Sequence, residues 1–297
     1  ASCADYHTSG AWTAVGVAAA AAKLLHCDAG QIRHAAGIGE YHGPRSPMMR
    51  CIDHPSMLRD GVGWGAPSGV TAAYLASMGF TGAPALTCEG ENAESYWADL
   101  GEAWRLVEHT HYKAYPCCRW AHPAIDSVLH LMGKHGLVAS DIDRVVIKTF
   151  HYATRLAGAR PANLDEFSYS ICFPVALAIV RGKIGVEELD AALLRDPDIL
   201  RISDRIELVD DEEMTRISID KRWAQVSLYT VDAKVFSDEP RSARGDPDDA
   251  LSDAELLAKF HALADGVLGV ERATELQEMA AQFDQLSVSE FNRLLDL

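Results

Sequence analysis

The segment Lys113–Asp126 brings an ammonium, a guanidinium, an imidazole, two thiols and a carboxylate into a short run of chain that two prolines interrupt. Pro116 and Pro123 restrict their own backbones and those of the residues before them, so the segment cannot be one continuous helix. We predict an extended run through Pro116, then a turn, then a helix with Pro123 in its first turn. The start of a helix has free N–H groups and a positive dipole end, which favour a bound anion.

Lys113 and Arg119 lie just before this predicted helix start and would form a corner that binds a carboxylate. The alternative is a loop between domains whose cations are only solvated, and composition alone favours that alternative.

A wider set of side chains would suit a reaction at a carbon next to a carboxylate. Such a reaction needs a base that removes the α-proton and a cation that holds the carboxylate as it gains enolate character. Each member also has a simpler interpretation as a helix cap, a core histidine, a strand residue or a solvated charge. The set is His7, Arg59, Lys113, Arg119, His122 and Tyr152.

Signatures of cofactor chemistry are missing from the sequence. No G-x-G-x-x-G follows a predicted strand, and there is no P-loop, H-E-x-x-H or G-x-S-x-G motif. His109, His111 and Cys117 fit no standard zinc spacing, so we predict neither a metal nor a cofactor.

Composition excludes other classes of protein. A net charge of −16 argues against non-specific binding to nucleic acid, and the apolar stretch around Ala18–Ala22 is too short to span a membrane. Seven cysteines in 297 residues favour reduced thiols and a cytoplasmic protein, without a recognisable signal peptide. Because the chain starts at Ala1 and enters helical pattern almost at once, we expect that part of the protein precedes it.

The first third of the chain is helical in pattern. Asp28 with Gln31 forms a capping box, and a long irregular stretch with several arginines, Tyr41–Gly65, separates two of the helices. Helices are predicted at Thr8–Leu25, Asp28–Gly39, Trp64–Met78 and Asn92–Trp104.

The middle of the chain combines strands and helices. Strands are predicted at Asp143–Phe150, Arg205–Val209 and Gln225–Val235 from their β-branched, alternating residues. Helices are predicted at Pro123–His135, Pro174–Arg181 and Val186–Leu194. A polar linker, Glu239–Asp249, then leads to C-terminal helices that capping boxes open at Ser252 with Glu255 and at Ser287 with Glu290.

These elements predict a mainly α fold with an α/β part. Residues 1–108 would form a helical domain and residues 109–245 a smaller α/β lid. Residues 246–297 would form helices that pack back on the helical domain, which makes the lid an insertion.

Several separated motifs occur in an order that resembles the MmgE/PrpD family over essentially the whole chain. They are Tyr6–Trp12, Asp53–Gly61, Gly79–Pro84, Lys113–Cys117, His122–Asp126 and Ser168–Ala176.

This resemblance implies a helical domain with an inserted α/β lid, an active site between them, and a homodimer. Family members include 2-methylcitrate dehydratase, cis-aconitate decarboxylase and iminodisuccinate epimerase. They act without metal on small di- or tricarboxylates. We therefore expect a cofactor-independent lyase of the dehydratase type, with a decarboxylase or an epimerase or isomerase as the alternatives.

The resemblance also assigns roles to residues. His7, Lys113 and Tyr152 match catalytic positions, and Arg59, Arg119 and His122 are expected to bind substrate. Arg59 stands where the family often has lysine; because arginine stays protonated it would clamp a carboxylate rather than remove a proton.

The family's N-terminal helical portion, with an Asp-Asp-Thr-His-like motif and a further histidine, finds no counterpart in this sequence. A third hypothesis follows, in which the chain is a non-catalytic module or a subunit that needs a partner chain.

Overall fold

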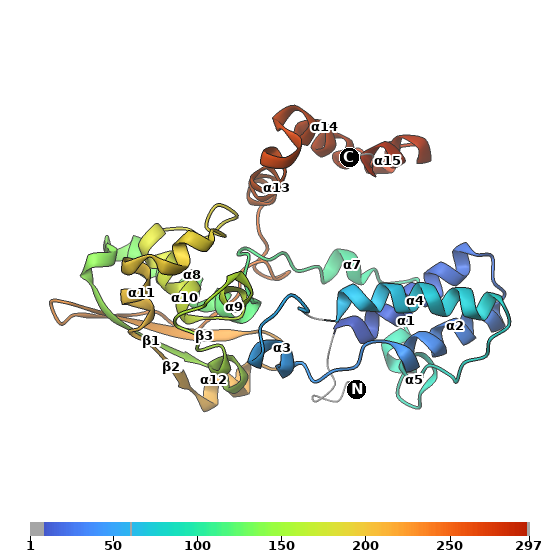
Figure 1. Ribbon diagram of the computed structural model, residues 1–297, viewed down its shortest axis with the longest axis horizontal. Helices are drawn as coiled ribbons and strands as arrows, with labels where there is room; N and C mark the ends of the chain where they lie inside the picture. Colours follow the sequence, from blue (N-terminus) through green and yellow to red (C-terminus); the bar gives the residue numbers. More distant parts are fainter. Residues whose placement is uncertain (1–8, 60, 296–297) are drawn as a thin grey trace. The chain divides into compact units, whose positions relative to one another are not determined.

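The computed structural model describes residues 9–59 and 61–295. The chain divides into two compact units, and each is described by itself (Figure 1). The helical unit comprises the described part of Ala1–Glu108 together with Arg155–Gly158 and Asp165–Tyr169. The α/β unit comprises the described part of His109–Thr154, Ala159–Leu164 and Ser170–Leu297. A mainly α chain with an α/β part is confirmed.

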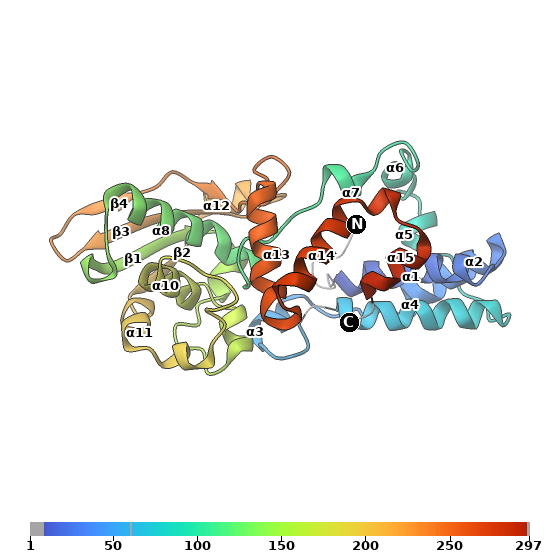
Figure 2. The same cartoon turned by 90° about the horizontal axis from the view of Figure 1, so that it is seen from above.

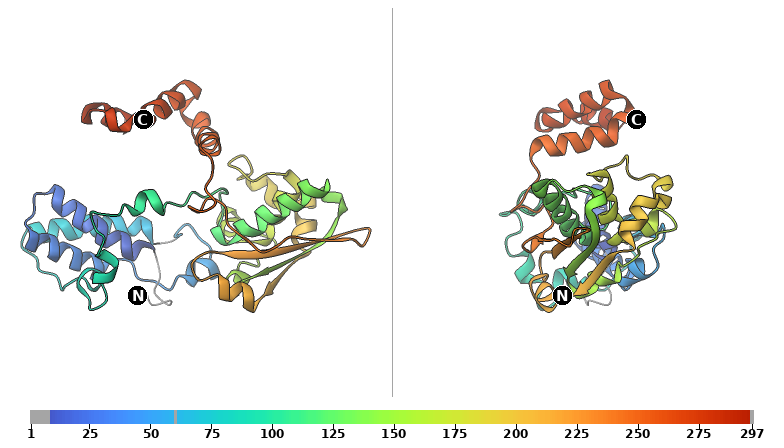
Figure 3. Two further views of the ribbon diagram at one scale, coloured as in Figure 1. Left: turned by 180° about the vertical axis from the view of Figure 1, so that it is seen from behind. Right: turned by 90° about the vertical axis from the view of Figure 1, so that its left-hand side faces the viewer.

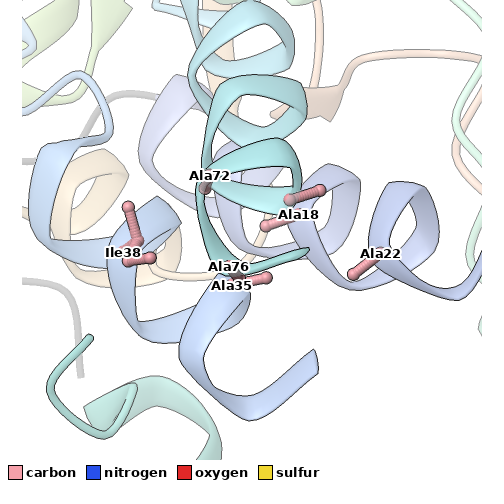
Figure 4. Close-up of a cluster of buried hydrophobic side chains, with 7 residues drawn as sticks. Ala18, Ala22, Ala35, Ile38, Ala72 and Ala76 are labelled. Atoms are coloured by element: carbon pink, nitrogen blue, oxygen red, sulfur yellow. The ribbon is translucent and has the colours of Figure 1, made fainter. Parts of the chain in front are cut away.

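Three helices make the core of the helical unit: α1 (Ser9–Leu24), α2 (Ala29–His42) and α4 (Val62–Ser77). Their contact residues are small, so the helix backbones approach closely (Figure 4). A Cβ atom added at Gly69 of α4 would lie 2.6 Å from the carbonyl oxygen of Ala14 in α1. The buried cluster consists of Ala18, Ala22, Ala35, Ile38, Ala72, Ala73 and Ala76.

The capping box predicted for α2 is confirmed. The Asp28 carboxylate accepts from the Gln31 backbone N–H at 2.8 Å, and the Gln31 side chain accepts from the Asp28 N–H at 3.0 Å. The helix runs to His42, one turn beyond the predicted end near Gly39.

The predicted helix Asn92–Trp104 is wrong. That stretch contains only the short α6 (Glu94–Trp97), followed by turns in which Gly101 has φ 90°. The indole N–H of Trp97 donates to the Thr87 carbonyl at 2.8 Å, so the tryptophan links the end of α6 to an earlier short helix. The remaining short helices of this unit are α3 (Met49–Asp53), α5 (Leu86–Glu89) and α7 (Arg105–Glu108).

A mixed sheet forms the centre of the α/β unit. Strand β1 (Ile142–Thr149) pairs in parallel with β2 (Ile206–Asp210) and antiparallel with β3 (Trp223–Thr230). The order is β2-β1-β3-β4, with β5 (Arg241–Ser242) also paired to β3.

The predicted strand Gln225–Val235 is two strands. The chain leaves β3 after Thr230, turns through Ala233 at φ 63°, and returns as β4 (Val235–Ser237). Alternating residues continue through the turn, which is why the pattern did not separate the strands.

Helices α8 (His122–His135), α10 (Cys172–Arg181) and α11 (Pro197–Ser203) lie on one face of this sheet (Figures 1 and 3). Side chains of β3 alternate between buried and half-buried, because one face of the strand meets these helices. The smaller α12 (Glu212–Ile217) also belongs to this unit, whereas α9 (Leu164–Ser168) lies almost entirely in the helical unit.

The predicted helix Val186–Leu194 is also wrong. A 3₁₀ turn, Ala191–Arg195, starts only after Asp190, whose carboxylate accepts from the Ala192 N–H at 2.8 Å. The Glu188 carboxylate is buried and accepts from the Gly185 N–H at 2.8 Å, which favours a turn over a helix.

The segment predicted as a polar linker, Glu239–Asp249, is part of the α/β unit. It contributes β5 to the sheet and buries Ala243 and Asp246. A run rich in Asp, Pro and Gly is typical of a solvated linker, but here the Asp246 carboxylate is buried and forms an ion pair with Arg119.

The C-terminal region contains α13 (Asp253–Leu268), α14 (Val270–Ala281) and α15 (Val288–Leu295), and α13 packs against α14 (Figure 2). Both predicted capping boxes are confirmed, with Ser252 Oγ and Ser287 Oγ accepting from the N–H groups of Glu255 and Glu290. That these helices pack back on the helical part stays a prediction. Among the described residues, no helix has the length and apolar character needed to cross a membrane.

The close contact between α1 and α4 gives a stability prediction. Gly69→Ala should lower the free energy of unfolding by about 1–3 kcal/mol, because the new Cβ meets backbone atoms of α1. Gly16→Ala in α1 is the control, since a Cβ there has no neighbour within 4 Å. It should be neutral or stabilising by up to about 1 kcal/mol. Urea unfolding of both variants measures this, and equal stability would contradict the packing described.

Candidate active site

The turn and the helix start predicted before α8 are confirmed, but the extended run predicted through Pro116 is wrong, because the chain already bends over residues 114–117. A 3₁₀ turn, Arg119–Ala121, leads directly into α8, and Pro123 lies in the first turn of that helix. Gly136 ends α8 at φ 61°, with its N–H donating to the Met132 carbonyl. The side chains ahead of α8 are therefore fixed to the start of a well-anchored helix.

The carbonyl oxygen of Cys117 joins two of the predicted site residues. Lys113 Nζ donates to it at 3.2 Å, and His122 Nε2 lies 3.3 Å from it. A carbonyl oxygen has two lone pairs, so it can accept from both groups. Lys113 itself is exposed, so its ammonium remains accessible to a ligand while this oxygen orients it.

His122 is fully buried. Because Nε2 faces a carbonyl oxygen, we assign the proton to Nε2, which leaves Nδ1 as an acceptor without a partner among the described residues. Burial, reinforced by the charges of Lys113, Arg119 and Lys259, lowers the pKa of His122 to about 3. The imidazole is therefore neutral at physiological pH.

Arg119 forms an ion pair with the carboxylate of Asp246, which is almost completely buried. The same carboxylate lies 2.8 Å from His111 Nδ1. Burial, together with the charge of Arg222, lowers the pKa of Arg119, although a guanidinium remains protonated. Burial and the charge of Arg119 lower the pKa of His111.

A second buried carboxylate, that of Asp126, accepts hydrogen bonds from two further residues of this unit. Tyr115 Oη donates to Asp126 Oδ1 at 2.5 Å, and Arg244 Nε donates to the same oxygen at 3.2 Å. Burial and the charge of Asp126 raise the pKa of Tyr115, so its hydroxyl stays protonated. The Tyr115 ring packs edge-on against His122 with their centroids 5.1 Å apart.

The buried cysteines do not suit nucleophilic chemistry. Cys117 and Cys172 are thiols, and burial raises the pKa of Cys117 and brings that of Cys172 to about 12. A thiol of such high pKa forms little thiolate. No group of three or more potential metal ligands occurs within residues 9–59 and 61–295.

The helical unit contains a separate cavity of about 470 Å³ around the irregular stretch before α4, with a mostly apolar wall that includes Met48, Leu58 and Trp64. Arg50, His54 and Arg59 line it together with Ser46 and Ser56. Arg50 Nη1 donates to Ser46 Oγ at 3.2 Å. Two guanidinium groups in one cavity of this size could bind a small anion.

Arg59 lines this cavity with a left-handed backbone conformation and an ion pair to a carboxylate. Its φ of 51° lies in the left-handed region, which is uncommon for a residue with a Cβ. Its Nη2 lies 2.6 Å from Asp165 Oδ1, and its guanidinium lies 5.9 Å from the centre of the Tyr169 ring.

The structure thus brings Lys113, Arg119 and His122 together in the α/β unit, and places Arg59 in the helical unit. His7 lies outside the described residues. Tyr152 is about half exposed in a 3₁₀ turn, His151–Arg155, with its ring against His151 at 5.4 Å. The roles predicted for these six residues stay predictions.

Sequence reasoning missed Asp246, Lys259 and Asp165 as partners of the predicted cations. Lys259 Nζ donates to the Lys113 carbonyl at 2.6 Å across a long separation in sequence. Asp246 stood in an expected linker, and no local pattern marks such distant pairs.

Two family models match the chain. The MmgE/PrpD N-terminal domain matches residues 2–100 and the MmgE/PrpD C-terminal domain matches residues 115–285. The protein belongs to the MmgE/PrpD family. We expected the family's N-terminal helical portion to be missing. That expectation is corrected in part, because residues 2–100 match the family's N-terminal domain. No curated protein matches the chain significantly.

The buried imidazole predicts a pH dependence of stability. Its pKa is about 3 in the folded state and about 6.5 when unfolded, so between these values only the unfolded chain takes up the proton. Protonation of His122 in the unfolded chain should therefore lower the free energy of unfolding by about 2 kcal/mol as the pH falls from 7 to 5. His122→Gln keeps an N–H donor but does not titrate, and urea unfolding at both pH values should show a correspondingly smaller loss for it. An equal loss in both proteins would refute the buried neutral imidazole.

Proposed function

We propose that this protein is a cofactor-independent lyase of the dehydratase type that acts next to a carboxylate of a small di- or tricarboxylate. One observation carries the proposal: in a chain of this family, the exposed Lys113 ammonium is held beside neutral His122 at the start of α8. Family membership supports the reaction class, and the cations support the substrate class.

Lys113 would bind a substrate carboxylate and stabilise it as the α-carbon loses its proton and negative charge moves onto the carboxylate. Arg59 would bind a carboxylate in the same way. In dehydration, the C–H bond breaks first or together with the neighbouring C–O bond, a C=C bond forms, and the hydroxyl leaves as water. No electron transfer is involved, so the chemistry requires no redox cofactor.

We assign proton transfer to His7 and Tyr152 on the resemblance described above. Arg119 is already paired with Asp246, so its part in substrate binding is weaker than that of Lys113. His122 would act mainly by orienting the Cys117 carbonyl and, through it, Lys113. A homodimer in the cytoplasm, with no nucleic acid or membrane partner, completes the proposal.

Decarboxylation and epimerisation remain the alternatives, because each also builds negative charge beside a carboxylate. The three reactions differ in what the substrate loses: water, CO₂, or only a proton that returns. Incubation with 2-methylcitrate, cis-aconitate and iminodisuccinate in D₂O separates them. Solvent deuterium in recovered substrate, without loss of water or CO₂, would favour the epimerase.

Lys113→Ala should lower kcat/KM by at least about a hundredfold on whichever of these substrates is turned over, because a charge-stabilising donor is lost. Lys113→Arg keeps the positive charge and should retain part of the activity. Lys134→Ala, an exposed lysine near the end of α8, is the control and should be as active as the wild type. Steady-state kinetics decide, and an unchanged Lys113→Ala enzyme would refute the assignment.

A further inference from the structure

Arg59 already has a carboxylate partner within the protein. Asp165 comes from α9 and belongs to the helical unit by its contacts, although the chain reaches it only after passing through the α/β unit. Its side chain is 24% exposed and that of Arg59 45%, so the pair lies near the surface rather than in the core, and Arg59 lines the cavity.

A second ion pair joins the same two stretches of chain with the charges reversed. Arg155 pairs with Asp53, at the end of α3. One stretch thus contributes Asp53 and Arg59, and the other contributes Arg155 and Asp165. The Asp53–Arg155 pair does not line the cavity. Of the two arginines in these pairs, Arg59 lines the cavity, and its partner is Asp165.

Asp165 Oδ1 occupies Nη2 of Arg59, and its negative charge repels a second carboxylate that approaches the same guanidinium, so the two carboxylates compete for it. From this geometry we propose that Asp165 is an internal competitor that a substrate carboxylate must displace from Arg59. Asp165 is then a specificity-determining residue, since only a ligand that supplies a carboxylate in its place can reach Arg59. The inference rests on the proposed function, in which Arg59 binds a carboxylate.

The size of the effect follows from the exposure of the pair. Ion pairs at this level of exposure contribute modestly and are screened by salt. Removing the competing charge should therefore tighten binding of a carboxylate ligand by about three- to fivefold at low ionic strength, and by less in high salt.

The test is calorimetric titration of the whole chain with citrate at pH 7.5, in low salt and in about 0.5 M salt. Asp165→Asn should lower the Kd about three- to fivefold in low salt, with a smaller gain in high salt. Asp165→Glu keeps the charge and should bind as the wild type does. Asp53→Asn removes the other carboxylate and should not tighten binding.

Arg59→Gln separates this inference from the proposed function. Suppose that Arg59→Gln loses citrate binding while Asp165→Asn binds citrate no more tightly than the wild type. The claim that Asp165 competes for Arg59 is then refuted, and the proposed role of Arg59 in binding a carboxylate stands. If Arg59→Gln binds citrate as the wild type does, both are refuted. Should Asp165→Asn fail to fold by circular dichroism, Asp165→Ser is titrated instead with the same expectation, and a Kd no lower than wild type overturns the inference.

Discussion

The carbonyl oxygen of Cys117 is the point on which the candidate site depends. It accepts a hydrogen bond from Lys113 and faces the N–H of His122, so it fixes an exposed ammonium and a buried imidazole relative to one another. This requires the backbone to present Cys117 just before a helix begins, and the two prolines together with the 3₁₀ turn at Arg119–Ala121 achieve that. Without the turn, Lys113 would be one more solvated lysine.

Two buried carboxylates hold the surrounding cations without neutralising Lys113. Asp246 is paired with Arg119, and Asp126 with Tyr115 and Arg244. These pairings connect the 3₁₀ turn at Arg119–Ala121 and α8 to the segment around Arg241–Asp249. In a chain with a net charge of −16, the exposed Lys113 ammonium thereby stays available to an acidic substrate.

The sequence predicted this organisation where the signals are local. Capping boxes, the prolines of the α8 segment and β-branched runs all depend on neighbouring residues. They placed the capped helices, α8, β1 and β2 correctly, but the same pattern merged β3 and β4 into one strand. The errors at Asn92–Trp104 and Val186–Leu194 arose where side-chain hydrogen bonds, from Trp97 to the Thr87 carbonyl and from the Gly185 N–H to Glu188, compete with the helical pattern. Family motifs pointed to Lys113 and Arg59 as candidates. They did not point to Lys259, which contacts Lys113, or to Asp165, which contacts Arg59, because a contact between residues far apart in sequence produces no local sequence pattern.

A crystal structure of the protein with citrate tests the central claim most directly. We predict a citrate carboxylate about 3 Å from Lys113 Nζ, with His122 still buried and its Nε2 directed at the Cys117 carbonyl. Citrate bound elsewhere, with Lys113 turned away from Cys117 into solvent, would contradict the account.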